Sequence, residues 1–123
     1  MALPRNRPTN LVATAAYMAD SGTASSVYMT APVRGQIKSF KSVLQGTVVG
    51  TANNAFTAFK GSSAITIDAW LQLTSGSAAG DVVTVNCASP TGFVNEGDTI
   101  RVTTDGAGSN VTPTMVYAII EAH

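Results

Sequence analysis

The sequence predicts a single all-β domain of about eight antiparallel strands, and three observations support this prediction. Apolar and polar residues alternate with a period of two along most of the chain, as they do in strands that bury one face. Clusters of Gly, Ser, Asn and Asp separate these runs where turns are expected. The length of 123 residues is that of one domain.

The chain divides into an N-terminal arm and the β domain. Residues 1–9 contain two prolines and two arginines and show no alternation. Proline denies a sheet the backbone donors that its ladder needs. We therefore expect residues 1–9 to form an extended arm and residues 10–123 to form the β-sandwich domain.

Three segments after the arm are predicted as strands. Residues 11–19 carry apolar side chains on one face, at Leu11, Ala13, Ala15 and Tyr17. In the next run the alternating apolar residues are Val27, Met29 and Ala31. Residues 35–46 fit two patterns, because Ile37, Phe40, Val43 and Leu44 have helical spacing, whereas serines and flanking glycines favour a strand. We predict a strand there, in which a bulge is an option.

Residues 64–73 show the cleanest alternation in the chain. Its apolar face carries Ile65, Ile67, Leu71 and Leu73, and its polar face carries Thr66, Asp68, Trp70 and Gln72. Trp70 on a polar face is either a platform that contacts a sugar or a protein, or a ring covered by a loop or by another chain. Tyr28 is a second candidate for such a platform.

Residues 82–102 read as a strand, a turn and a second strand. The apolar positions are Val83, Val85 and Cys87 in the first run and Ile100 and Val102 in the second. Glu96-Gly97-Asp98 marks the turn between them. The segment is typical of a half-buried antiparallel sheet.

Residues 114–122 differ from the other runs because both faces of the predicted strand are apolar. Met115, Tyr117 and Ile119 lie on one face, and Val116, Ala118 and Ile120 lie on the other. In a two-layer sandwich such a strand needs a neighbour on its outer side. Met115, Val116, Tyr117 and Ile119 are therefore the candidate residues for a contact between subunits.

The composition favours assembly and excludes two classes of partner. Charged residues make up 11% of the chain, compared with about 25% in typical soluble domains, and the formal net charge is zero. With a mean hydropathy of +0.20, this indicates apolar surface buried between subunits, or alternatively a monomer with a well-filled core. The seven basic residues are scattered, which argues against nucleic-acid binding. No apolar run approaches the roughly 20 residues of a membrane span.

Groups suited to catalysis or metal binding are scarce. His123 is the only histidine and the last residue, so we expect it to fray. Neither a Ser-His-Asp nor a Cys-His arrangement, nor a zinc site, can then form in the body of the fold. The single cysteine, Cys87, alternates with valines and is expected to be a buried apolar residue. We predict a protein without enzymatic activity, cofactor or metal.

The acidic residues are expected to have structural roles. Those at turn positions are Asp20, Asp81, Glu96, Asp98 and Asp105. Short acidic side chains at turns bond to nearby backbone. The loop of residues 105–110 also offers oxygens that could hold calcium, although it lacks the spacing of an EF-hand. A hairpin turn is the other interpretation of this loop.

The order of turn and strand motifs resembles a known group of proteins. The motifs are Val33-x-Gly35-x-Ile37, residues 55–61, residues 76–82, Val94-x-Glu96-Gly97-Asp98-x-Ile100 and Asp105-Gly106. Over residues 10–120 they resemble small virion proteins of tailed bacteriophages, of the capsid decoration (cement) and head-fibre base types. The resemblance implies a jelly-roll-like β-sandwich, homotrimers on the outer capsid surface of the virion, and synthesis in the host cytoplasm. It also implies a partner, the major capsid protein, whose neighbouring subunits would be bridged.

Two functional hypotheses follow. The first is a structural protein that decorates and stabilises a capsid, with the arm as a clasp whose candidate contact residues are Leu3, Pro4, Arg5, Arg7 and Pro8. The alternative is a head-fibre, receptor-binding or carbohydrate-binding domain of a virion that uses Trp70 and Tyr28 as platforms.

Overall fold

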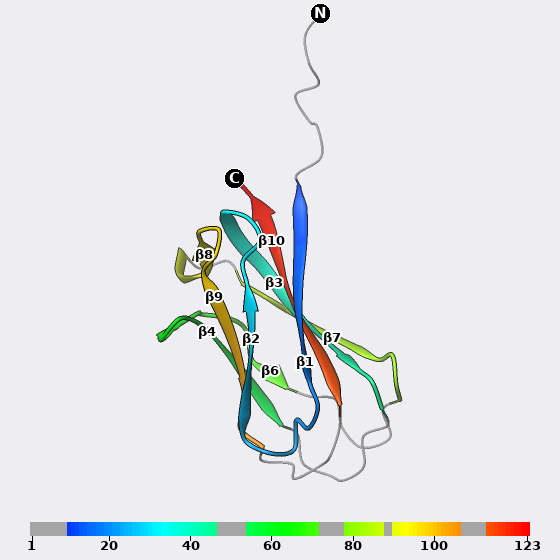
Figure 1. The fold of residues 1–123 in the computed structure, drawn as a ribbon. Helices are drawn as coiled ribbons and strands as arrows, with labels where there is room; N and C mark the ends of the chain where they lie inside the picture. The colour runs from blue at the N-terminus through cyan, green and yellow to red at the C-terminus, as the bar shows by residue number, and fades with distance from the viewer. Residues whose placement is uncertain (1–9, 47–53, 72–77, 88–89, 107–112) are drawn as a thin grey trace, which may run out of the picture.

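The computed structural model describes residues 10–46, 54–71, 78–87, 90–106 and 113–123, which form two antiparallel sheets packed face to face (Figure 1). The strands are β1 (Leu11–Met18), β2 (Ser25–Thr30), β3 (Gly35–Leu44), β4 (Ala55–Lys60), β5 (Ser63–Ala64), β6 (Trp70–Leu71), β7 (Val82–Asn86), β8 (Phe93–Val94), β9 (Thr99–Thr104) and β10 (Thr114–Ala122). A 3-10 turn, η1 (Pro90–Gly92), precedes β8. The predicted arm, residues 1–9, lies outside the described residues.

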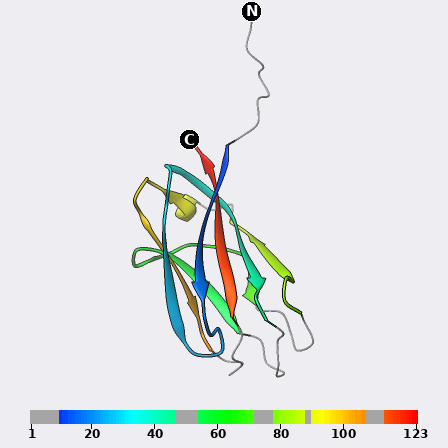
Figure 2. The same cartoon turned by 45° about the vertical axis from the view of Figure 1, so that its right-hand side comes forward.

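The strand pairs are nested along the chain. Sheet A has the order β1-β10-β3-β7, with β8 also paired to β3, and sheet B has the order β2-β9-β4-β5, with β6 also paired to β4. The outermost pair in sequence, β1 with β10, is in sheet A, and the next pair, β2 with β9, is in sheet B (Figure 2). The inner pairs alternate between the sheets in the same way. This is the jelly-roll arrangement, and the predicted all-β antiparallel sandwich is confirmed.

The core lies between the sheets and is formed by alternate residues of each long strand. In β10, Val116, Ala118 and Ile120 are fully buried, while Met115, Tyr117 and Ile119 are only half-buried. The predicted alternation in β10 is therefore confirmed, with one face in the core. In β1 the apolar face predicted from the sequence points outward: its side chains are exposed, and Met18 is the residue that joins the core.

Residues 35–44 form strand β3, so the strand prediction is confirmed, and the bulge is present. Ile120 of β10 pairs with Ile37, whereas the adjacent Ile119 pairs with Ser39. Lys38 is the extra residue, and it is exposed. Because the bulge shifts the alternation by one residue, Ile37 and Phe40 both enter the core. Their helical spacing in the sequence has this cause.

The interpretation of residues 82–102 as one sheet is wrong. Strand β7 lies in sheet A and β9 in sheet B, so the two apolar faces meet across the core and do not share a ladder. The predicted turn itself is present. The Asp98 amide donates to the Asn95 carbonyl at 3.0 Å, and Gly97 has a positive φ of 90°. A side chain at Gly97 would strain the backbone.

Residues 64–73 do not form one continuous strand. Ser63–Ala64 and Trp70–Leu71 are separate short strands on β4, and residues 65–69 between them leave the ladder. Ile65 is buried, but after this excursion the alternation has changed phase, so that Trp70 is buried and Leu71 is 46% exposed. An odd shift in phase moves every later side chain to the other face. Leu73 and Gln72 lie outside the described residues.

Candidate assembly surface

The outer face of sheet A presents apolar side chains from all four of its long strands. Directly paired residues of antiparallel strands project to the same side of a sheet. Tyr17 of β1 pairs with Met115 of β10, Met115 pairs with Val43 of β3, and Val43 pairs with Val82 of β7. An unbroken apolar row thus crosses all four strands. Its two ends are open to solvent, because Tyr17 is 54% and Val82 50% exposed.

Three further rows complete this surface, which we call face A. The second row contains Ala15, Tyr117, Lys41 and Thr84. The third contains Ala13, Ile119, Ser39 and Asn86. The fourth contains Leu11, Glu121, Gln36 and Phe93. Lys41 and Glu121 are the only charged members of the four rows, and the exposed bulge residue Lys38 lies beside them next to Ser39, so face A is apolar in its first row and more polar in the others.

The structure places three of the four predicted interface residues on face A and one elsewhere. Met115, Tyr117 and Ile119 are half-buried on the outer side of β10. Val116 has no exposed surface and packs in the protein's own core, so the prediction that it joins an interface is wrong. Period-two alternation put Val116 on the opposite face from the other three, and the structure shows that this face points inward.

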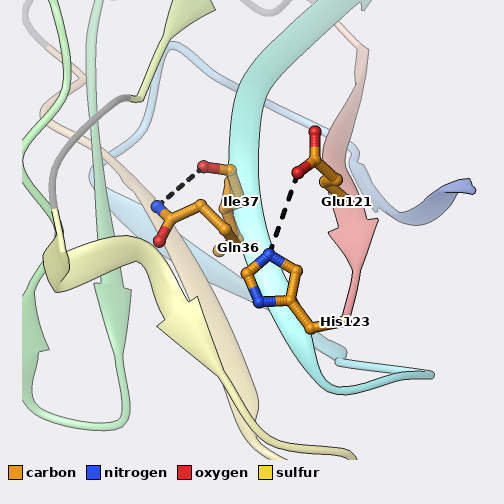
Figure 3. Close-up of polar contacts among 4 residues, drawn as sticks. All are labelled: Gln36, Ile37, Glu121 and His123. Atoms are coloured by element: carbon orange, nitrogen blue, oxygen red, sulfur yellow. Dashed lines mark hydrogen bonds and ion pairs between the residues drawn. The ribbon is translucent and has the colours of Figure 1, made fainter. Parts of the chain in front are cut away.

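The C-terminal residue is held in place, contrary to the expectation that it frays (Figure 3). The backbone amide of His123 donates to the Arg34 carbonyl at 3.0 Å, and its ring packs edge-on against Phe93 with centroids 5.9 Å apart. Its Nε2 lies 3.8 Å from Oε1 of Glu121, and the nearby Gln36 amide donates to the Ile37 carbonyl at 3.1 Å. The bond to Arg34 ties the end of β10 to the start of β3, and the ring contact packs it against Phe93 of β8.

Within the described ranges the structure brings together no group of three residues that could hold a metal ion. Cys87 is 1% exposed, so it is the buried apolar residue that its alternation predicted. In the same part of the chain, no helix has the length and apolar character required to cross a bilayer.

Four of the five acidic residues predicted at turns bond to backbone, as expected, and for the fifth, Glu96, this stays a prediction. Oδ1 of Asp20 accepts from the Gly22 amide at 2.9 Å, and Oδ2 of Asp98 accepts from the Asn95 amide at 2.8 Å. The Asp81 carboxylate closes its turn in the same way. Oδ1 of Asp105 accepts from the Ala55 amide at 3.0 Å, which ties the end of β9 to β4. The rest of the proposed calcium loop, from residue 107, lies outside the described residues.

The two predicted ring platforms do not form a shared site. Trp70 is 2% exposed and lies in the core between Phe40 and Phe56, so the prediction that it is a ligand platform is wrong. The protein's own chain covers it, and its indole N–H donates to the Ser42 hydroxyl at 3.2 Å. Tyr28 is 63% exposed on the outer face of sheet B. The candidate contact residues of the arm, Leu3, Pro4, Arg5, Arg7 and Pro8, lie outside the described residues.

Comparisons with known proteins find similarity of structure alone. No family model and no curated protein matches the sequence. One similar solved structure is described by the words "Bacillus endospore appendages form a novel family of disulfide-linked pili"; it is 14% identical, covers 100% of this chain and 98% of its own, and has a TM-score of 0.41. A structure of FLHE is 13% identical, covers 95% of this chain and 100% of its own, and has a TM-score of 0.46. At these values neither similarity supports an argument about function.

Proposed function

We propose that this chain is a structural protein without catalytic activity, which acts by assembling with copies of itself on a larger particle through face A. The observation that carries the proposal is the apolar row of Tyr17, Met115, Val43 and Val82 across the whole of sheet A. Exposed apolar patches of a few hundred Å² are often functional, and contact with another protein is one such function.

The size of face A suits a contact that is weak alone and strong when repeated. Strands lie about 4.8 Å apart and successive rows about 6.8 Å apart, so four rows on four strands cover about 500 Å². A specific interface of standard size buries about 800 Å² on each partner. A contact through face A alone is therefore weak, and it gains strength when many copies bind side by side on one particle.

The finer form of the proposal is a capsid decoration protein. It rests on the resemblance of the sequence motifs to tailed-phage decoration and head-fibre base proteins. In this form, homotrimers bridge neighbouring major capsid protein subunits on the outer surface of the virion. Residues 1–9 act as the clasp on the shell. Deleting residues 1–9 is then expected to weaken binding to capsid shells while the melting temperature of the domain is unchanged. Undiminished binding by the truncated protein would exclude the clasp.

Self-association through face A is tested by analytical ultracentrifugation of the intact chain and of Met115→Glu. The substitution places a carboxylate in the middle of the apolar row, so the oligomer is expected to dissociate. Thr57→Glu is the matched control, because Thr57 is exposed on the outer face of sheet B. The control protein should remain oligomeric, and both variants should keep the melting temperature of the monomeric fold. Because the contact is weak alone, the parent protein is examined up to millimolar concentration, and the absence of any self-association there would reject the proposal.

A further inference from the structure

The outer face of sheet B differs from face A and carries a row of three linked side chains. Tyr28 of β2 pairs with Arg101 of β9, and Arg101 pairs with Phe59 of β4. The neighbours of Arg101 in β9, Ile100 and Val102, are fully buried, so Arg101 projects outward. Its side chain therefore lies between two aromatic residues on the surface of the sheet.

The guanidinium of Arg101 is held in place and has no counterion among the described residues. Its central carbon lies 4.1 Å from the centroid of the Phe59 ring, a close cation–π contact. Its Nε is buried without a hydrogen-bond partner, and no described carboxylate forms an ion pair with it. The Phe59 ring offsets part of the hydration that this cation has lost, but its charge is not neutralised by any described carboxylate. An anion that binds the guanidinium would neutralise it.

The surroundings of this row are neutral and rich in hydroxyl groups. On one side lies the row of Thr30 and Thr99, and on the other the row of Ser26, Thr103 and Thr57. The hydroxyls of Ser26 and Thr103 are 2.8 Å apart. Arg101 is the only charged member of these three rows. A single cation is too few for a nucleic-acid backbone, which needs clustered Lys and Arg.

A hollow of about 300 Å³ lies beside the same row. It is lined by Thr57 and Phe59 of β4, by residues 64–69, among which Asp68 is an exposed carboxylate, and by the buried Phe56, Ala58 and Trp70. The hollow is mainly apolar, and its volume equals the lower limit of the range of about 300–1,000 Å³ found for small-ligand pockets. A ligand that reaches Arg101 can thus place a ring or an acyl group next to Phe59.

We propose that this surface binds a carboxylate-bearing sugar. The guanidinium fork of Arg101 holds the carboxylate through two parallel hydrogen bonds, which is the geometry that Arg offers and Lys lacks. The exposed Tyr28 ring packs against the C–H face of the sugar, and the hydroxyls of Ser26 and Thr103 meet its hydroxyl groups. This site is independent of assembly through face A. Of the two platforms predicted from the sequence, the proposed site uses Tyr28. Trp70 is buried and takes no part, and Arg101 and Phe59 supply the remaining contacts.

The test is a titration of the intact, isotope-labelled protein with three acidic sugars, followed by NMR. The probes are N-acetylneuraminic, glucuronic and galacturonic acid, with galactose as the neutral control. We expect amide shifts at Tyr28, Arg101 and Thr103 that saturate with at least one acid and are absent with galactose. Arg101→Lys keeps the charge but loses the fork, and should weaken binding about tenfold. Lys41→Gln removes a cation from face A and should leave binding unchanged.

Two outcomes would overturn the proposal. One is the absence of saturating shifts with all three acids, and the other is equal weakening by Arg101→Lys and Lys41→Gln, which would indicate unspecific attraction. Tyr28→Ala is a second test of the site, which remains valid if the Arg101 variant does not fold. Because Tyr28 is 63% exposed, its removal should leave the melting temperature unchanged and still weaken sugar binding several-fold. Full binding by a folded Tyr28→Ala protein would also count against the site.

Discussion

Replacing Trp70 with Ala removes the largest of the fully buried side chains. The indole lies 5.4 Å from the Phe40 ring and 5.1 Å from the Phe56 ring, measured between centroids. It also donates its N–H to the Ser42 hydroxyl at 3.2 Å. We expect the substitution to destabilise the fold, in contrast to the loss of ligand binding that an exposed platform would have predicted.

The magnitude follows from the buried area. A tryptophan buries about 200 Å² of side-chain surface, which at about 25 cal/mol per Å² corresponds to about 5 kcal/mol. Measured truncations of large aromatic residues cost about 3–5 kcal/mol. We therefore expect the free energy of unfolding to fall by about 4 kcal/mol, a large share of the roughly 5–15 kcal/mol of a typical domain.

The assay is urea unfolding followed by far-ultraviolet circular dichroism, because Trp70 is the only tryptophan and its fluorescence is lost in the variant. Ser42→Ala is the matched control. It keeps the ring and removes only the hydrogen-bond acceptor, and should cost about 1–2 kcal/mol. A loss below about 1 kcal/mol for Trp70→Ala would refute the placement of the ring in the core.

Two further predictions concern backbone packing and thiol access. Gly35→Ala should cost at least about 2 kcal/mol, because a Cβ there would meet the Glu121 carbonyl of the adjacent β10 strand. Gly46→Ala, where the nearest atoms are 3.4 Å away, is the control, and equal thermal melts of the two variants would contradict the close approach. Cys87 should resist iodoacetamide in native buffer and react once urea unfolds the chain. Rapid native labelling would show that its surroundings open readily.

Local patterns in the sequence predict the strands where the ladder is regular. The period-two pattern of β10 correctly separates Val116 from Met115 and Tyr117, because a nine-residue strand without a break keeps its phase. The same rule misplaces Trp70, because the chain leaves the ladder between Ile65 and Trp70 and returns with the phase changed. Alternation carries no information on where such an excursion begins or ends.

The pairing of strands is beyond local patterns. Adjacent runs such as β7 and β9 fall in different sheets, although turn residues between them suggest a hairpin. Which face of β1 enters the core also depends on its partner, and the apolar face that contains Tyr17 turns out to be the outer one. The row of Tyr28, Arg101 and Phe59 has no signal in the sequence, because its members come from three strands that meet only in the folded sheet.

The nesting of the strand pairs has a consequence for how the protein is made. Leu11 at the start of β1 is the ladder partner of Glu121, almost at the C-terminus. During translation the first described strand therefore leaves the ribosome long before its partner exists, and sheet A cannot close until β10 has been synthesised. Folds dominated by such distant pairings mature in milliseconds to seconds, whereas helical bundles fold in microseconds to milliseconds. Throughout that interval β1 has an unsatisfied hydrogen-bonding edge, and it contains neither charge nor proline to discourage pairing with other nascent chains.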